Sequence, residues 1–348
     1  MRAMLVSHPY ERLTPQLVLD ALQSVGWRGD GRLLQLNSYE NRVFQVMLED
    51  GSAVVAKFYR PGRWSDAQIL EEHHFALQLA QQEIPVIAPL PLQGDDSAPI
   101  PGMLCIGDPP TLARWSESDA VFRLGLYPRH SGHGPELDDP QVLSWLGRFV
   151  GRLHAVARTE PFQARRRLDA ATYGHGSLQR LLEGDAVTPA QRTGFEAAAQ
   201  SALMLVDAAF TQAGELPLLR LHGDFHPGNI LWREEGPHIV DLDDCCTGPA
   251  VQDLWMLLSG SQQAMRTQLL RVLDGYAAFM AFDMRELALI EPLRTLRMLH
   301  HSAWLADRWA DPAFPAAFPW FGSANYWSQQ TQQLREQVEA MQAEPLAL

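Results

Sequence analysis

The sequence predicts an α+β protein of two lobes, a small one rich in strands and a larger one built from helices. Strand-like runs are concentrated in the first third of the 348 residues. Apolar residues at helical spacing dominate the rest. Between these regions, residues 128–140 form a polar stretch rich in glycine and proline, which is typical of a linker. We therefore expect an N-terminal lobe at residues 1–128 and a C-terminal lobe at residues 129–348.

Capping and turn residues define the elements of the N-terminal lobe. Thr14-Pro15 begins a helix that Gly26 ends, because proline suits the first turn of a helix and glycine its end. Asp50-Gly51 predicts a hairpin turn between two strands, and Ser65-Asp66 caps a second helix. The predicted strands are 32–36, 42–48, 53–58 and 121–127, the second helix is 65–79, and residues 90–110 are loops around a short strand.

The C-terminal lobe reads as a series of helices with one interruption, residues 218–244, which carries the polar motifs described below. Each helix is predicted from apolar residues that recur every three or four positions. The predicted helices are 141–156, 178–183, 189–213, 251–258, 265–279, 286–308 and 328–341.

Composition excludes several classes of function. The chain has 41 acidic and 28 basic residues and a net charge of −13, which disfavours non-specific binding to nucleic acid or to anionic membranes. Three cysteines cannot form a disulfide framework in a chain of this length. The first nine residues lack the apolar core of a leader peptide, and the apolar runs are shorter than the ~18 residues of a membrane span. We expect a cytoplasmic monomer.

The strongest motif is His-Gly-Asp-Phe-His-Pro-Gly-Asn at residues 222–229, followed by a short apolar strand that ends at Asp241. Phosphoryl transfer needs a carboxylate that orients and deprotonates the acceptor hydroxyl, and oxygen ligands that hold Mg²⁺ on the phosphates. Asp224 and Asn229 lie on one loop and can face one pocket, and Asp241 supplies a second oxygen ligand. An ordinary polar turn uses the same residue types, but the order of the motif and the strand-end aspartate favours phosphoryl transfer.

Lys57 lies inside an otherwise apolar strand. A buried lysine needs an anion beside it, although an edge-strand lysine can also extend to water. The following helix offers Glu71 and Glu72. Glu72 is preferred because it precedes Phe75 and Leu79 at helical spacing and so shares their inward face.

These motifs resemble the protein-kinase-like fold, in the branch of aminoglycoside, choline and homoserine kinases. The chain is most similar, over nearly its whole length, to the bacterial stress response kinases, which are Ser/Thr protein kinases. Asp-x-x-x-x-Asn is shared across the fold, whereas Asn-Ser-Tyr-Glu-Asn-Arg and Asp-Leu-Asp-Asp are more specific. The stretches that carry the resemblance are 36–43, 56–61, 222–232, 240–244, 248–255, 297–301 and 311–315.

The resemblance implies an ATP- and Mg²⁺-dependent kinase that phosphorylates Ser and Thr of proteins in a stress response. By position, Asp224 is then the catalytic base, Asn229 and Asp241 are the Mg²⁺ ligands, and Lys57, held by Glu72, binds the ATP phosphates.

Two further contacts with ATP follow from the same resemblance. Ser38, in the turn between the first two strands, would contact the phosphates. The backbone at Leu126 and Tyr127 would meet the adenine edge, with ATP between the lobes. The chain departs from eukaryotic kinases, because it has no glycine-rich loop at 37–41 and no long activation loop after Asp244. Activity should therefore not require phosphorylation of such a loop.

Other interpretations of these residues remain open. A small-molecule kinase of the aminoglycoside, homoserine or choline type would use the same motifs, and a cationic acceptor would suit the acidic balance. A nucleotide-binding pseudokinase is disfavoured, because such a module has no use for a base. A zinc site at His222 and His226 is disfavoured because Pro227 prevents a regular helix. Cys245 and Cys246 are expected to be inert rather than redox-active.

Overall fold

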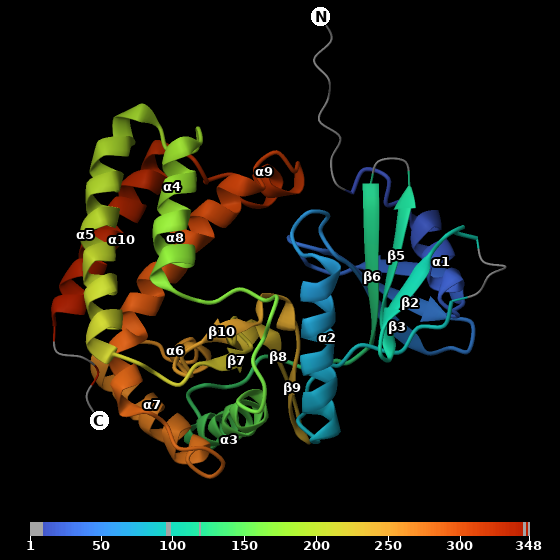
Figure 1. Cartoon of the computed structure of the whole chain (residues 1–348), viewed down its shortest axis with the longest axis horizontal. Coiled ribbons are helices and arrows are strands. Elements are labelled where there is room, and N and C mark those ends of the chain that lie inside the picture. The colour runs from blue at the N-terminus through green and yellow to red at the C-terminus, as the bar shows by residue number, and fades with distance from the viewer. Residues whose placement is uncertain (1–9, 95–98, 118–119, 344–345, 347–348) are drawn as a thin grey trace, which may run out of the picture. The chain divides into compact units, whose positions relative to one another are not determined.

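The computed structural model describes residues 10–94, 99–117, 120–343 and 346, which form two compact units (Figure 1). The N-terminal unit comprises the described residues up to His133 together with Leu231–Asp243. The C-terminal unit comprises Gly134–Ile230 and the described residues from Asp244 onward. The predicted α+β class is confirmed, since a sheet forms the first unit and helices dominate the second. Residues 1–9, in which the sequence analysis expects no leader peptide, lie outside the described residues.

The N-terminal unit is built on an antiparallel sheet of six strands in the order β1-β2-β3-β6-β5-β4. The hairpin predicted at Asp50-Gly51 joins β2 to β3, and Gly51 adopts the positive φ of 84° that such a turn requires. The strands are β1 (Gly29–Gln35), β2 (Arg42–Leu48), β3 (Ala53–Phe58), β4 (Leu104–Gly107), β5 (Pro110–Glu117) and β6 (Ala120–Pro128).

Two helices cover opposite faces of this sheet (Figure 1). Helix α1 (Pro15–Ser24) has Thr14 as its N-cap and packs on the face that carries Ala56 and Phe58. Helix α2 (Asp66–Gln81) begins with a complete capping box at Ser65. Because side chains alternate along a strand, Lys57 points to the face opposite to Ala56 and Phe58, which is the face covered by α2.

Residues 231–243 belong to the N-terminal unit, a segment that the predicted boundary at 128/129 does not include. Strands β8 (Ile230–Arg233) and β9 (Gly236–Ile239) form a small hairpin. The Ile239 N–H donates to the Pro85 carbonyl at 2.7 Å, and the Ile87 N–H donates to the Ile239 carbonyl at 2.9 Å. Backbone pairing between segments this distant in sequence leaves no local pattern to predict it from.

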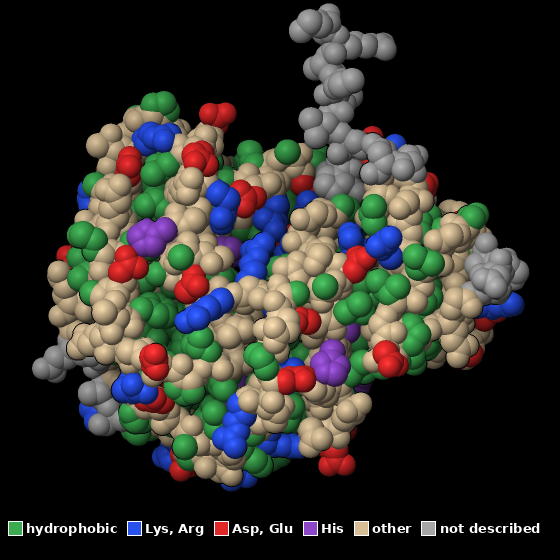
Figure 2. Space-filling model, viewed as in Figure 1, with side chains coloured by type: hydrophobic (Ala, Val, Ile, Leu, Met, Phe, Trp, Pro, Cys, Tyr) green, Lys and Arg blue, Asp and Glu red, His purple; other side chains and the backbone are tan. Residues whose placement is uncertain are grey.

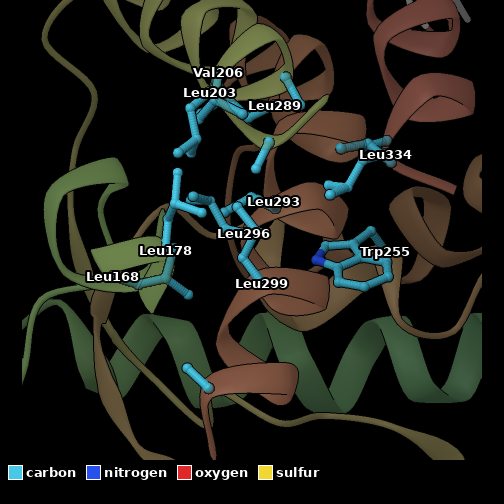
Figure 3. Close-up of a cluster of buried hydrophobic side chains, with 14 of the residues drawn as sticks. Leu168, Leu178, Leu203, Val206, Trp255, Leu289, Leu293, Leu296, Leu299 and Leu334 are labelled. Carbon is cyan, nitrogen blue, oxygen red and sulfur yellow. The ribbon is translucent and has the colours of Figure 1, made fainter. Parts of the chain in front are cut away.

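The C-terminal unit is a group of helices with one two-stranded ladder, β7 (Leu219–Leu221) paired to β10 (Cys246–Gly248). Its core gathers leucines of α4, α5, α8 and α10 around Leu293 and Leu296 (Figure 3). The helices are α3 (Pro140–Ala157), α4 (Gly176–Glu183), α5 (Pro189–Ala213), α6 (Gln252–Trp255), α7 (Gln262–Tyr276), α8 (Ile290–Asp307), α9 (Ala313–Ala317) and α10 (Ala324–Gln342).

Some of the predicted elements were wrong or missing. Strand β5 was not predicted, because its sequence mixes buried and charged residues without alternation. The helix predicted at 251–258 is only the single turn α6. The start of the helix predicted at 286–308 is a 3₁₀ helix at Met284–Leu289. The short α9 was also missed.

Helices α3 and α7 approach closely at three glycines, Gly147, Gly151 and Gly275. A Cβ at Gly147 would overlap the Val272 carbonyl oxygen, and one at Gly151 would lie 2.7 Å from the Tyr276 carbonyl oxygen. The backbones of the two helices are therefore in direct contact, which only glycine permits.

We predict that Gly147→Ala lowers the free energy of unfolding by at least about 2 kcal/mol, because the helices must separate to admit a methyl group. Gly194→Ala on α5 is the matched control, since a Cβ there meets nothing within 4 Å. It should raise stability by up to about 1 kcal/mol through helix propensity. Urea unfolding of both variants measures the difference, and two changes of equal sign would contradict the prediction.

The surface carries charges of both signs. Acidic and basic side chains are interspersed with apolar ones on the face shown in Figure 2. No helix in the described part of the chain combines the length and apolar character needed to cross a membrane.

Candidate active site

Lys57 occupies a buried cluster of acidic side chains in the N-terminal unit. It is only 7% exposed, and its Nζ lies 3.1 Å from an oxygen of Asp241, 3.2 Å from Asp243 and 3.5 Å from Glu72. Burial by itself lowers the pKa of a lysine, but these three carboxylates raise the pKa of Lys57 well above its ordinary value. Lys57 is therefore a fixed, desolvated positive charge.

The structure also distinguishes the two candidate glutamates. Glu72 is buried and forms the ion pair with Lys57, whereas Glu71 is only half-buried. The helical-spacing argument that favoured Glu72 therefore selected the partner seen in the structure.

Asp241 and Asp243 follow β9 and differ in their surroundings. Asp241 has φ +61°, and its side chain is 53% exposed. Asp243 is buried, forms an ion pair with Arg63 and accepts a hydrogen bond from Asn41 Nδ2 at 3.2 Å. Asp243 is thus enclosed by Lys57, Arg63 and Asn41, while Asp241 presents a carboxylate outward. Of the two, only Asp241 has room for an additional cation.

The turn that carries Ser38 is held by side-chain contacts of its neighbours. Ser38 is half-buried between β1 and β2. Asn41 Oδ1 accepts the Arg60 N–H at 3.1 Å, and Arg60 Nε lies 3.0 Å from Glu40 Oε1. Since Asn41 also binds Asp243, this turn and the acidic cluster form one connected network.

Leu126 and Tyr127 lie on β6, beside β3. The Leu126 carbonyl accepts the Leu90 N–H at 2.7 Å, so that carbonyl already has a partner within the protein. The Tyr127 hydroxyl contacts the Tyr59 hydroxyl at 2.7 Å and His73 Nε2 at 3.1 Å. Burial raises the pKa of Tyr127 and that of Tyr59, so both remain neutral. No pattern in the sequence indicated this buried network.

Asp224 lies in the C-terminal unit, on the loop that follows β7. Arg297 Nη1 of α8 is 2.5 Å from Asp224 Oδ1, and His226 Nε2 is 3.4 Å from Asp224 Oδ2. Asn229 Nδ2 donates to the Asp224 carbonyl at 3.0 Å, which leaves the amide oxygen of Asn229 to face other groups. Burial would raise the pKa of Asp224, but His226 and Arg297 hold it well below its usual range. Asp224 is therefore ionised at neutral pH.

The loop of Asp224 is anchored by Asp253. The two carboxylate oxygens of Asp253 accept the backbone N–H groups of His222 and Gly223, each at 2.8 Å. His154 Nε2 lies 3.1 Å from Asp253, and its Nδ1 is 3.0 Å from the Tyr276 hydroxyl. Asp253 therefore holds the loop backbone through a buried network that includes His154 and Tyr276, neither of which the sequence analysis singled out.

Both histidines of the motif accept backbone N–H groups of their own loop through Nδ1. His222 Nδ1 accepts the Asp224 N–H at 3.3 Å, and His226 Nδ1 accepts the Gly228 N–H at 2.9 Å. Because Nδ1 of His226 accepts, its Nε2 carries the proton and faces Asp224. Among the described residues, no group of three His, Cys, Asp or Glu could hold a metal ion.

The adjacent cysteines are both buried. Arg165 Nε donates to Cys245 Sγ at 3.0 Å. Burial raises the pKa of Cys246 well above its ordinary value, which disfavours the reactive thiolate.

Glu286 fixes the start of α6, the turn that carries Asp253. Its Oε2 accepts the Val251 N–H at 2.8 Å, and the side chain is 1% exposed. Burial raises the pKa of Glu286 to about 7.

This shift predicts a stability that falls with rising pH. A carboxyl whose pKa is raised on folding binds more protons in the folded state, so its stabilisation is present below the unfolded pKa near 4.5 and is lost as the pH rises through about 7. The loss amounts to about 3 kcal/mol. Glu286→Gln should flatten the free energy of unfolding between pH 5 and pH 8, as measured by urea unfolding at each pH. An unchanged slope would contradict the assignment.

Comparison with known proteins is consistent with this arrangement. The model of the phosphotransferase enzyme family matches residues 32–290. Proteins named Stress response kinase A from Salmonella choleraesuis and Escherichia coli K12 are each 40% identical over 339 residues, which is 97% of both chains. A Salmonella typhimurium protein named Serine/threonine protein kinase RdoA matches with the same identity and coverage.

Solved structures share the fold at lower identity. An amicoumacin kinase, hAmiN, in complex with AMP-PNP, Ca²⁺ and Ami has a TM-score of 0.69 at 21% identity, covering 97% of this chain and 96% of that one. A microcompartment-associated aminopropanol kinase has a TM-score of 0.68 at 16% identity, covering 94% of this chain and 97% of that one.

Proposed function

The chain belongs to the phosphotransferase enzyme family and is a kinase related to the stress response kinases A, and we propose that it transfers the γ-phosphoryl group of ATP to Ser and Thr hydroxyls of proteins. The observation that carries this choice of acceptor is the 40% identity, over 97% of both chains, to a protein named as a Ser/Thr protein kinase. The intact set of Lys57, Asp224, Asn229 and Asp241 supports catalysis over a binding module.

In this proposal Lys57 binds the phosphates of ATP. Its charge is held in place by Glu72 and Asp243, so it needs no reorganisation when the phosphate oxygens arrive. The carboxylate of Asp241, which is exposed and contacts Lys57, would bind a metal ion in addition to Lys57. The turn at Ser38 and the backbone at Leu126 and Tyr127 are proposed to contact the phosphates and the adenine edge, respectively.

A divalent cation fits the donor set, since carboxylate and amide oxygens are the ligands that Mg²⁺ prefers. Asp241 would hold it with its carboxylate, and Asn229 with its amide oxygen. The amide nitrogen of Asn229 already donates to the Asp224 carbonyl, which leaves the oxygen for the ion. Bound Mg²⁺ would neutralise charge on the phosphate oxygens.

Asp224 is proposed as the base for the acceptor. Its carboxylate orients the Ser or Thr hydroxyl and takes its proton while the hydroxyl oxygen bonds to the γ-phosphorus and the bond to the ADP oxygen breaks. Asp253 keeps this loop in place through two backbone hydrogen bonds, and we therefore assign it a positioning role.

The test is incubation with γ-labelled ATP and Mg²⁺, alone, with a Ser/Thr-rich protein and with a panel of small alcohols, with Asp224→Asn as the control. Label on protein serine or threonine that the variant loses would support the proposal. Label only on a small alcohol would contradict it and favour a small-molecule kinase, for which the net charge of −13 suits a cationic acceptor. Absence of transfer despite ATP binding would indicate a regulatory module.

A further inference from the structure

One conspicuous motif, Arg-Met-Leu-His-His at 297–301, has no role in the mechanism above. It lies on α8, and its first residue forms the 2.5 Å ion pair with Asp224. The Arg297 side chain is 43% exposed. Arg297 therefore occupies Oδ1, one of the two oxygens with which the proposed base could accept the proton of the hydroxyl.

Three side chains after Arg297 form a row of successive contacts towards the end of α8. His301 lies one turn further along the helix, and burial together with the positive charge of Arg297 lowers its pKa. Its ring stacks on Trp304, with centroids 5.6 Å apart and planes at 23°. Arg308 Cζ lies 5.4 Å from the Trp304 ring centre. Arg297, His301 and Trp304 recur at the three-to-four-residue spacing of one helix face, and Arg308 is the C-cap that follows α8. We call these four residues the α8 stripe.

The α8 stripe is cationic in a chain whose net charge is −13. The acidic residues of α8 are engaged elsewhere, because Glu291 pairs with Arg294 at 3.0 Å and Asp307 pairs with Arg180 at 3.3 Å. Arg297 and Arg308 are eleven positions apart, which corresponds to roughly 16 Å along a helix. An extended peptide of about five residues has that length.

We propose that the α8 stripe recognises an acidic peptide segment next to the acceptor Ser or Thr, with Arg297 as the main specificity-determining residue. This rests on the proposed protein-kinase function. A carboxylate of the peptide takes over the guanidinium of Arg297, which leaves Asp224 for the hydroxyl. Trp304, stacked on His301 and lying under the Arg308 guanidinium, holds these two side chains in place beside the peptide, and Arg308 takes a second carboxylate. Recognition of the acceptor and release of the base are then one event.

Binding and transfer are measured separately, so that failure of this inference is distinguishable from failure of the proposed function. Fluorescence anisotropy uses a dye-labelled peptide of one serine flanked by glutamates, the same peptide with glutamines or lysines, and an oligonucleotide of equal charge. Transfer from γ-labelled ATP uses the three peptides. The variants are Arg297→Gln and Arg308→Gln, and Arg335→Gln, an exposed arginine of α10, is the matched control.

The glutamate peptide should bind at least tenfold more tightly than the glutamine peptide, and the lysine peptide should not bind. Arg297→Gln should weaken that binding about tenfold, the loss expected for one charged hydrogen-bonded pair, with a smaller loss for Arg308→Gln and none for Arg335→Gln. Equal binding of all three peptides, or tighter binding of the oligonucleotide, would overturn the inference. Selective binding without transfer to any peptide would instead support the α8 stripe and contradict the kinase assignment to protein acceptors.

Discussion

Asp224→Asn is expected to lower the rate of phosphoryl transfer by about 10³-fold while ATP still binds, because general bases in enzymes contribute on the order of 10²–10⁴. The substitution keeps the size of the side chain and removes its charge and its ability to accept a proton. The proposed phosphate contacts are made by Lys57 and Asp241, whereas Asp224 is proposed to act on the acceptor hydroxyl. Transfer and nucleotide affinity should therefore separate.

The measurement pairs single-turnover transfer with titration of a fluorescent ATP analogue. Asp207→Asn is the matched control, since Asp207 lies on α5 and pairs only with the exposed His175 among the ion pairs described. It should leave both quantities unchanged. If Asp224→Asn retained more than a tenth of the transfer rate, Asp224 could not be the base. A variant that had lost ATP binding as well would indicate that the loop had rearranged.

Features encoded locally were predicted well from the sequence. The Thr14 cap, the Ser65 cap and the Asp50-Gly51 hairpin each depend on a few neighbouring residues, and all are present in the structure. Helical spacing alone also selected Glu72 as the partner of Lys57. In each case a short stretch of chain specifies the geometry, so one sequence is sufficient.

Contacts between distant segments were not predictable in this way. Asp243 meets Arg63 and Asn41, and Arg297 meets Asp224, only because the fold brings them together. The same holds for the hydroxyl network of Tyr127, since nothing at that position indicates a buried partner. A buried cation beside several carboxylates is a tertiary property, and its members are scattered along the sequence.

One signal in the sequence was nevertheless available for Lys57. Of the 28 basic residues, 27 are arginines and Lys57 is the single lysine. A chain that uses arginine everywhere else indicates that this position requires a compact point charge, which a planar guanidinium does not provide. The structure gives the reason, since one nitrogen contacts three carboxylates within 3.5 Å.

Lys57→Met should therefore have the largest combined effect on stability and activity. Removing the cation leaves Glu72 and Asp243 buried beside each other, and loss of one partner from a buried pair costs about 3–5 kcal/mol. Transfer should fall by about 10²–10³-fold, as when one preorganised donor is removed from an active site. Lys57→Arg should also lose most of its activity, because a guanidinium cannot place one nitrogen among three carboxylates.

A double variant separates the two effects. Lys57→Met with Glu72→Gln also removes the buried charge that Lys57 balances, so it should regain part of the lost free energy of unfolding without regaining transfer. Urea unfolding and single-turnover transfer on wild type, both single variants and the double variant form a complete cycle. Recovery of transfer in the double variant would show that Lys57 serves only to neutralise Glu72. Persistent inactivity in a stabilised protein is the expected result, because phosphate binding needs the charge of Lys57 itself.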